Sequence, residues 1–107
     1  MIEDYHFHIY FDSDSKEFAL KLRDRILLKD GINYQNKIHS FPIGPHVLPQ
    51  YAIVCPVELF PILIRFFMLN NGGLSILIHP NTGNAIKDHL DHAVWIGKQL
   101  PLLTDAL

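Results

Sequence analysis

The chain has 107 residues, a formal net charge of −2 at neutral pH and a hydrophobic fraction of 49%. This length predicts one domain over residues 1–107, with enough apolar side chains to form a core without disulfides or a structural metal. The nearly balanced charge provides no basic stripe for a nucleic acid and no polybasic or amphipathic signal for a membrane surface. We therefore expect small molecules or proteins as partners.

The first predicted strand covers residues 5–11 and carries two imidazoles at alternate positions. Because successive side chains of a strand point to opposite faces, His6 and His8 share one face and Phe7 and Ile9 share the other. Two imidazoles roughly 6.6 Å apart on one sheet face supply part of a metal site.

The rest of the chain alternates between helical and strand patterns. After the first strand we expect a helix over 15–29, strands over 34–43 and 50–55, a helix over 59–70, a strand over 74–78 and a final helix over 84–97. The order β-α-β-β-α-β is typical of the ferredoxin-like, split β-α-β sandwich. The sequence therefore predicts an α+β fold with a four-stranded antiparallel sheet and an extra C-terminal helix.

The single cysteine, Cys55, excludes an intramolecular disulfide, and its apolar neighbours predict a buried thiol rather than a nucleophile. The chain does not open with a secretory signal pattern, and its longest apolar stretches are interrupted at Pro61 and Arg65. A reducing, cytoplasmic location is the expectation.

Most of the histidines are expected at one end of the sheet. We expect the first strand to be central, parallel to the third strand and antiparallel to the second and fourth. In that arrangement His46, His79 and the start of the last helix, which carries His89 and His92, all lie where the first strand begins. The opposite end is then expected to hold Cys55, Glu58, Asp12 and Asp14. The imidazole is the most common metal ligand, so the convergence predicts a metal site.

The carboxylates expected near this end are Glu3, Asp4, Asp88 and Asp91. Asp88 and His92 are four residues apart on one predicted helix face, so a hydrogen bond between them could fix the tautomer of His92 and raise its basicity. His39, in the middle of the second strand, is expected to be an ordinary strand histidine.

Four segments of the chain resemble successive motifs of the DOPA 4,5-dioxygenase family of fungi and bacteria. They are YHFHIYF at 5–11, FPIGPH at 41–46, LNNGGLSILIHPNTG at 69–83 and DHLDHAVWIG at 88–97. The resemblance extends over nearly the whole chain. It implies an extradiol ring-cleaving dioxygenase that opens a catechol, such as L-DOPA, with Fe(II) as cofactor and O2 as co-substrate. Three protein ligands leave the iron open positions for catechol and O2.

The resemblance carries over candidate site residues. The expected metal ligands are His8, His46 and His79, with His6 as an alternative or a fourth contact. His89 and His92 are the candidate acid–base or substrate-orienting residues, supported by Asp88. A site of two histidines and one carboxylate would instead use Asp88, Asp91, Asp4 or Glu3. Zinc or nickel would also suit an all-histidine site.

The sequence leaves the substrate and the activity open. No cluster of charges is evident for the amino-acid group of DOPA, since the apolar second helix has Arg65 as its one interior charge, so a simpler catechol is equally expected. The histidine face also carries Tyr10, and we expect a homodimer to bury it. The alternative function is a non-catalytic dimeric module that binds a metal or a small ligand.

Overall fold

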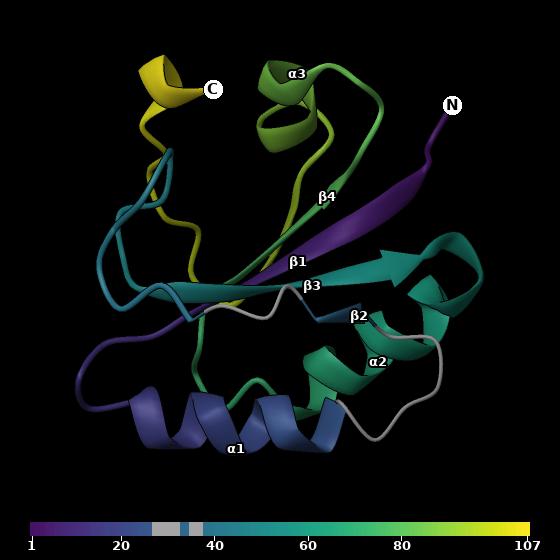
Figure 1. Cartoon of the computed structure of the whole chain (residues 1–107). Coiled ribbons are helices and arrows are strands. Elements are labelled where there is room, and N and C mark those ends of the chain that lie inside the picture. The colour runs from purple at the N-terminus through teal and green to yellow at the C-terminus, as the bar shows by residue number, and fades with distance from the viewer. Residues whose placement is uncertain (27–32, 35–37) are drawn as a thin grey trace.

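The computed structural model describes residues 1–26, 33–34 and 38–107. Five strands form one antiparallel sheet in the order β2-β3-β1-β4-β5 (Figure 1). The elements are β1 Asp4–Tyr10, α1 Lys16–Ile26, β2 Asn33–Tyr34, β3 Gln50–Pro56, the short turn η1 Val57–Leu59, α2 Phe60–Asn70, β4 Ile76–Pro80, α3 Ala85–His89, β5 Val94–Ile96 and the short turn η2 Thr104–Ala106. The predicted α+β class and ferredoxin-like architecture are confirmed.

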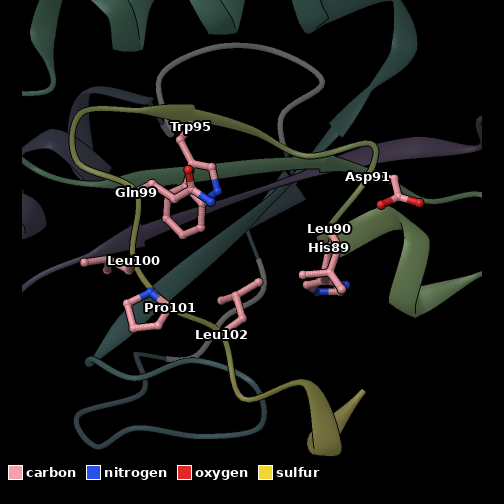
Figure 2. A pocket seen from close by; sticks show the side chains of 8 residues that line it. All are labelled: His89, Leu90, Asp91, Trp95, Gln99, Leu100, Pro101 and Leu102. Atoms are coloured by element: carbon pink, nitrogen blue, oxygen red, sulfur yellow. The ribbon is translucent and has the colours of Figure 1, made fainter.

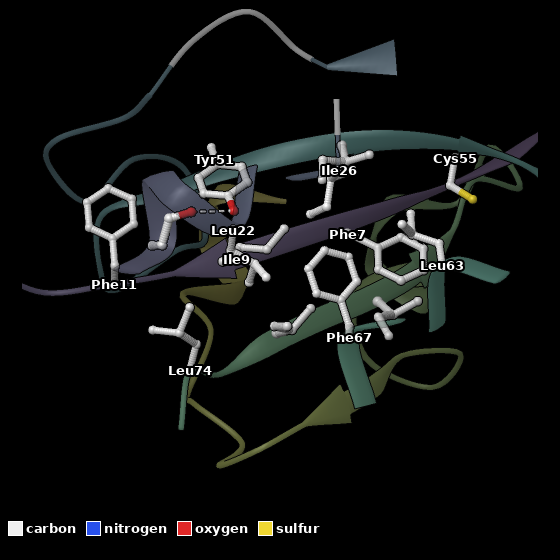
Figure 3. Packing of buried hydrophobic residues seen from close by; sticks show 14 residues of the cluster. Phe7, Ile9, Phe11, Leu22, Ile26, Tyr51, Cys55, Leu63, Phe67 and Leu74 are labelled. Atoms are coloured by element: carbon white, nitrogen blue, oxygen red, sulfur yellow. Dashed lines mark hydrogen bonds between the residues drawn. The ribbon is translucent and has the colours of Figure 1, made fainter. Parts of the chain in front are cut away.

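One face of the sheet is covered by α1 and α2 and holds the hydrophobic core (Figure 1). The apolar positions of β1 alternate with its histidines, so Phe7 and Ile9 point into this core. Leu22 of α1 and Phe67 of α2 pack against them, and the rings of Phe7 and Phe67 stack with centroids 5.4 Å apart (Figure 3). The amphipathic helices thus fix β1 from one side and leave its other face for a site.

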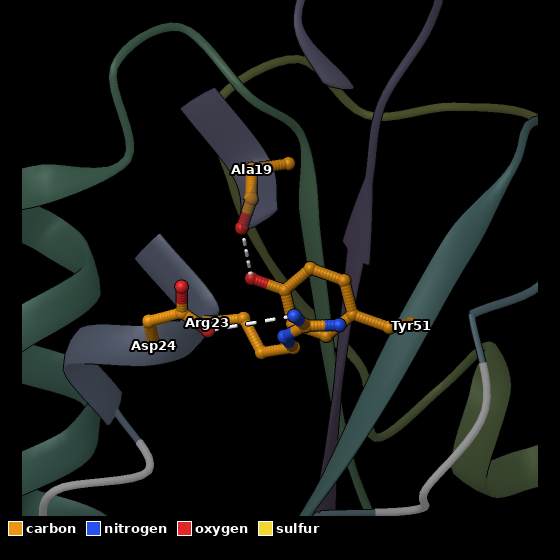
Figure 4. Close-up of polar contacts among 4 residues, drawn as sticks. All are labelled: Ala19, Arg23, Asp24 and Tyr51. Carbon is orange, nitrogen blue, oxygen red and sulfur yellow. Dashed lines mark hydrogen bonds and ion pairs between the residues drawn. The ribbon is translucent and has the colours of Figure 1, made fainter. Parts of the chain in front are cut away.

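A buried hydrogen bond ties α1 to the sheet across this core. The hydroxyl of Tyr51, on β3, donates to the backbone carbonyl of Ala19 at 2.8 Å (Figure 4). One turn further along α1, Arg23 pairs with the neighbouring Asp24 at 3.4 Å. The tyrosine is fully buried, so its hydroxyl needs this partner.

The opposite face of the sheet carries His6, His8 and Tyr10 and is covered from within the chain. The loop over 38–49, helix α3 and the C-terminal segment all stand on this side (Figure 1). Tyr10 is only 1% exposed and His8 only 7%. The expectation of a bare histidine face is therefore wrong, and with it the reason given for a homodimer; the oligomeric state itself stays a prediction.

The predicted direction of the third strand is also wrong. β1 pairs antiparallel with β3, so that Tyr5 lies opposite Cys55 and Tyr10 lies opposite Gln50. A β-α-β crossover keeps β1 and β2 in one direction, and the following hairpin reverses β3. The loop that carries His46 consequently starts at the Tyr10 end of β1, opposite to the end we expected. It reaches the histidines because it folds back over the sheet.

Because β3 is reversed, Cys55 and Glu58 lie at the Tyr5 end of β1 and not at the opposite end, where they were expected. Cys55 nevertheless stays apart from the histidines because its side chain belongs to the core face. The prediction of a buried, unpaired thiol is confirmed.

The final helix is much shorter than predicted. It ends at His89 rather than Gly97, and Val94–Ile96 form β5 instead, paired antiparallel with β4. Branched and aromatic side chains suit this edge strand. Gly97 follows with a φ of +77°, and a Cβ there would come within 2.6 Å of the Leu74 carbonyl oxygen. The fifth strand therefore replaces most of the predicted C-terminal helix.

The other boundaries shift less. The first helix is observed over Lys16–Ile26 and the fourth strand over Ile76–Pro80, and 27–29 of the predicted first helix lie outside the described residues. Of the predicted strand over 34–43, residues 35–37 lie outside the described part, His39 forms one bridge with Gln50, and residues 40–43 are irregular. Within the described ranges, no helix is both long and apolar enough to cross a bilayer.

Candidate functional site

Five imidazoles gather on the covered face of the sheet. They are His6 and His8 of β1, His79 of β4, His46 of the 38–49 loop and His89 at the end of α3. His6 and His79 are direct cross-strand partners, with ring centroids 5.1 Å apart. The rings of His8 and His46 lie 4.3 Å apart and those of His79 and His89 lie 4.0 Å apart. The predicted convergence exists, although His46 arrives from the other end of the sheet.

The hydrogen bonds of His8 and His79 fix which nitrogen of each ring is free. Nδ1 of His79 donates to the Pro80 carbonyl at 2.9 Å, and Nδ1 of His8 donates to the side-chain oxygen of Gln50 at 3.0 Å. Both oxygens can only accept, so a neutral ring must carry its proton on Nδ1 and keep a lone pair on Nε2. The two Nε2 atoms lie 3.1 Å apart.

Two lone pairs that face each other across this distance repel, unless a cation binds to both. Ligands about 2.1 Å from one ion and at right angles lie about 3.0 Å apart, close to the observed separation of the two Nε2 atoms. The donor set of His8 and His79 therefore fits a metal ion with right-angle ligands, such as Fe(II) or Ni, whereas tetrahedral Zn would hold the two nitrogens about 3.4 Å apart.

His46 and His89 are also held through Nδ1. His89 donates from Nδ1 to the Ala85 carbonyl at 2.8 Å, which leaves its Nε2 free. Nδ1 of His46 and the hydroxyl of Tyr10 are 2.6 Å apart. Burial raises the pKa of Tyr10 above its ordinary value, so the phenol stays protonated. Both rings are thus oriented by specific partners.

Two overlapping triads can hold an ion, because their ligand atoms lie within 4.8 Å of one another: His6, His8 and His79 form one, and His8, His46 and His89 form the other. The sequence-derived set of His8, His46 and His79 takes members from both. No carboxylate belongs to either triad among the residues the structure describes.

The environment keeps the imidazoles of His6, His8, His46 and His79 neutral. Burial is the main cause that lowers the pKa of His46 to about 4 and that of His79 to about 4, and the neighbouring imidazole of His89 is a smaller cause for both. Burial also lowers the pKa of His8 well below its ordinary value, with repulsion from His46 adding to the effect. For His6 burial again lowers the pKa, partly opposed by Asp4. Neutral imidazole is the form that binds a metal.

Asp88 is buried and holds a loop rather than a histidine. Its carboxylate accepts from the backbone N–H of Thr82 at 2.8 Å and from the Thr82 hydroxyl at 2.6 Å. Burial alone would raise the pKa of Asp88, but the bonds from Thr82 lower it overall and keep the carboxylate charged. Within the described part of the chain, the expected hydrogen bond to His92 is not formed, and His92 is exposed outside both triads.

The segment that follows β4 connects the cluster to its neighbours. Asn81 donates from its side chain to Asp4 at 2.6 Å, which fastens the segment to the start of β1. Gly83 takes a φ of +96°, and the Asn84 side chain caps α3 by accepting from the Lys87 N–H at 3.1 Å. These contacts, together with Asp88, place α3 so that His89 meets His79.

A pocket of about 310 Å³ lies beside His89 (Figure 2). The α3–β5 connection, β5 and the segment after it line this pocket with His89, Leu90, Asp91, Trp95, Gln99, Leu100, Pro101 and Leu102. Trp95 also stacks on Tyr10, with ring centroids 5.9 Å apart. This pocket was not expected from the sequence, because the predicted final helix ran through Asp91 and Trp95. The run Val94-Trp95-Ile96 was the available signal, since such residues favour strands.

The roles of Gln50 and Tyr10 in orienting His8 and His46 were also missed. They depend on the β1–β3 register, which no local sequence pattern gives.

Comparisons with known proteins give a consistent set of relatives. A sequence model of the Dopa 4,5-dioxygenase family matches residues 5–106. A protein named DOPA 4,5-dioxygenase from Amanita muscaria is 37% identical over 94% of this chain, which corresponds to 48% of that protein. An uncharacterized 21.2 kDa protein from Botryotinia fuckeliana is 36% identical over 89% of this chain and 58% of its own length. The chain thus spans about half the length of these curated relatives.

The fold has a solved counterpart. A crystal structure from Nostoc punctiforme, described as a candidate dioxygenase, superposes with a TM-score of 0.94 at 33% sequence identity. The match covers 97% of this chain and 90% of that one.

Proposed function

Since the chain belongs to the Dopa 4,5-dioxygenase family, we propose that it is a metal-dependent dioxygenase that opens a catechol ring with O2. The observation that carries this proposal is the pair of Nε2 lone pairs of His8 and His79, 3.1 Å apart in a buried cluster beside a pocket. Such an arrangement is costly to bury without a cation, and ring cleavage of a catechol needs a metal next to a substrate site.

We assign the metal to the triad of His6, His8 and His79. These residues lie on the adjacent strands β1 and β4, whose backbone ladder fixes their spacing. His46 and His89 come from a loop and a short helix, which hold a ring less rigidly. When bound, Fe(II) supplies open positions at which catechol and O2 meet.

In this assignment His89 is the acid–base residue. It lines the pocket, and its Nε2 has a lone pair because Nδ1 is held by the Ala85 carbonyl. It can accept a proton from a catechol hydroxyl and return it later in the reaction. His46, oriented by Tyr10, lies next to His8 with ring centroids 4.3 Å apart and can hydrogen-bond to a bound hydroxyl. Asp88 acts indirectly, by holding the loop and helix that carry His79 and His89.

The pocket walls position an aromatic substrate. Trp95 offers a flat surface for an aromatic ring, and Leu100 and Leu102 add apolar surface to the wall.

The test is oxygen uptake. The purified protein would be loaded anaerobically with Fe(II), mixed with L-DOPA, caffeate or protocatechuate, and exposed to O2. We expect a yellow product and uptake of one O2 per catechol consumed, with no uptake by protein loaded with Zn, which has no redox chemistry. Tight metal binding without uptake on any catechol would contradict the proposal and favour a non-catalytic binding module.

A further inference from the structure

The pocket beside His89 has an asymmetric charge. Asp91 is the one charged side chain among its described lining residues, and the remainder of the wall is aromatic, amide or aliphatic. Asp91 is exposed, and no cation pairs with it within the described part of the chain. The pocket therefore has a negative charge at a solvent-accessible position and no positive charge to balance it.

The lining residues divide the pocket into a part that can hold an aromatic ring and a part that can hold a charged substituent. Trp95 lies on one side of the pocket, His89 lies across from it, and Asp91 lies beyond His89 at the outer edge (Figure 2). A catechol that directs its hydroxyls toward the histidines has its ring beside Trp95. The substituent on that ring can then approach Asp91 at the accessible side. A volume of about 310 Å³ falls in the range of small-molecule sites and leaves room for such a substituent.

We propose that Asp91 selects catechols with an ammonium-bearing side chain and disfavours catechols that end in a carboxylate. This inference rests on the proposed function, because it assumes that the pocket receives the catechol. An ammonium next to Asp91 forms an ion pair, whereas a carboxylate there is repelled and finds no cation among the described lining residues. Because Asp91 is exposed, the effect on affinity is about threefold to fivefold.

Trp95 provides a direct readout, since it is the one tryptophan of the chain and lines the pocket. Quenching of its fluorescence would be titrated in protein loaded with Zn, so that binding is measured without turnover. The probes are dopamine, 3,4-dihydroxyphenylacetate and 4-methylcatechol, which carry a cation, an anion and no charge on similar rings. The variants are Asp91→Asn and the matched control Asp14→Asn, an exposed aspartate outside the pocket.

We expect wild type to bind dopamine more tightly than dihydroxyphenylacetate. Asp91→Asn should weaken dopamine about threefold to fivefold, tighten dihydroxyphenylacetate by a similar factor and leave 4-methylcatechol within about twofold. Asp14→Asn should change none of these affinities.

An absence of quenching by all three probes, or equal effects of Asp91→Asn on all three, would overturn the inference. The experiments distinguish a failure of the proposed dioxygenase activity from a failure of the proposed role of Asp91. Missing O2 uptake with an intact charge preference contradicts only the dioxygenase, and uptake without a charge preference contradicts only the role of Asp91.

Discussion

At the scale of single residues, the hydrogen bond between Tyr10 and His46 orients the imidazole of His46, and removing it tests this role. We predict that Tyr10→Phe lowers the free energy of unfolding by about 1 kcal/mol, because Nδ1 of buried His46 loses its partner. Urea unfolding would measure it. Tyr5→Phe is the matched control, since the Tyr5 ring packs on Phe60 and its hydroxyl has no hydrogen bond among the described residues. Equal losses in both variants would refute the role of Tyr10.

The imidazole of His79 is predicted to be essential for metal binding. His79→Ala should lose the bound ion and turnover, with its far-UV circular dichroism unchanged, because the triad loses one of its two facing Nε2 atoms. Metal content after dialysis measures the first effect and O2 uptake the second. His92→Ala, at an exposed position outside both triads, should keep its metal. Unchanged turnover in His79→Ala would contradict the assignment of His79 as a metal ligand.

Cys55 gives a pH-dependent prediction away from the cluster. Burial raises the pKa of its thiol to about 11, whereas the thiol ionises near 9 in the unfolded chain. Between these values the unfolded state releases a proton that the native state keeps, so the native state loses stability as pH rises from about 9 to about 11. Unfolding free energies of wild type should fall more steeply over this window than those of Cys55→Ala. Parallel slopes would contradict the raised pKa.

At the scale of elements, Asp88 is one of the residues that hold the loop between β4 and α3. We predict that Asp88→Ala lowers the free energy of unfolding by about 2 kcal/mol, because two hydrogen bonds from Thr82 to a carboxylate are lost. It should also weaken metal binding, since the loop positions His79 and His89. Thermal unfolding and metal titration measure these effects. In the control Asp91→Ala, the free energy of unfolding should stay within about 0.5 kcal/mol of wild type. A loss as large as that of Asp88→Ala would show that removing any nearby negative charge destabilises the protein, and would contradict a specific role of Asp88.

The elements also show what the sequence could predict. The alternation in β1 predicted correctly that His6 and His8 face away from the core, because side-chain parity is a local property. The direction of β3 was wrong, because pairing depends on partners distant in sequence. The strand β5 was missed because the predicted helix was extended through it, although its three branched and aromatic residues favour a strand and pair with β4. The pocket at Trp95 and Asp91 could not be predicted once that strand was missed.

At the scale of the whole molecule, the histidine face is covered, so a homodimer must use another surface. The outer face of α2 exposes Ile62, Met68 and Leu69, with fractional exposures of 50%, 59% and 84%. Residues seven apart lie on one helix face, so Ile62 and Leu69 belong to one apolar stripe, which the exposed Arg65 interrupts between them.

We predict a homodimer through this stripe, with twice the 12.3 kDa mass of one chain by size-exclusion chromatography and light scattering. Leu69→Glu should shift the protein to monomer, because a charge is placed on the apolar stripe. Phe41→Glu, at an equally exposed position in the 38–49 loop, is the control. A stable monomer of wild type would refute the prediction.

The central claim is that the histidine cluster on the covered sheet face is a metal centre. A crystal structure of the metal-loaded protein tests it most directly, by showing which nitrogens lie within about 2.0 to 2.2 Å of the ion. We predict one ion bound by His6, His8 and His79, with His89 facing the pocket and not bound. An ion held by His8, His46 and His89 would contradict the assignment of the triad, and a metal-loaded protein with no ion on these histidines would contradict the claim itself.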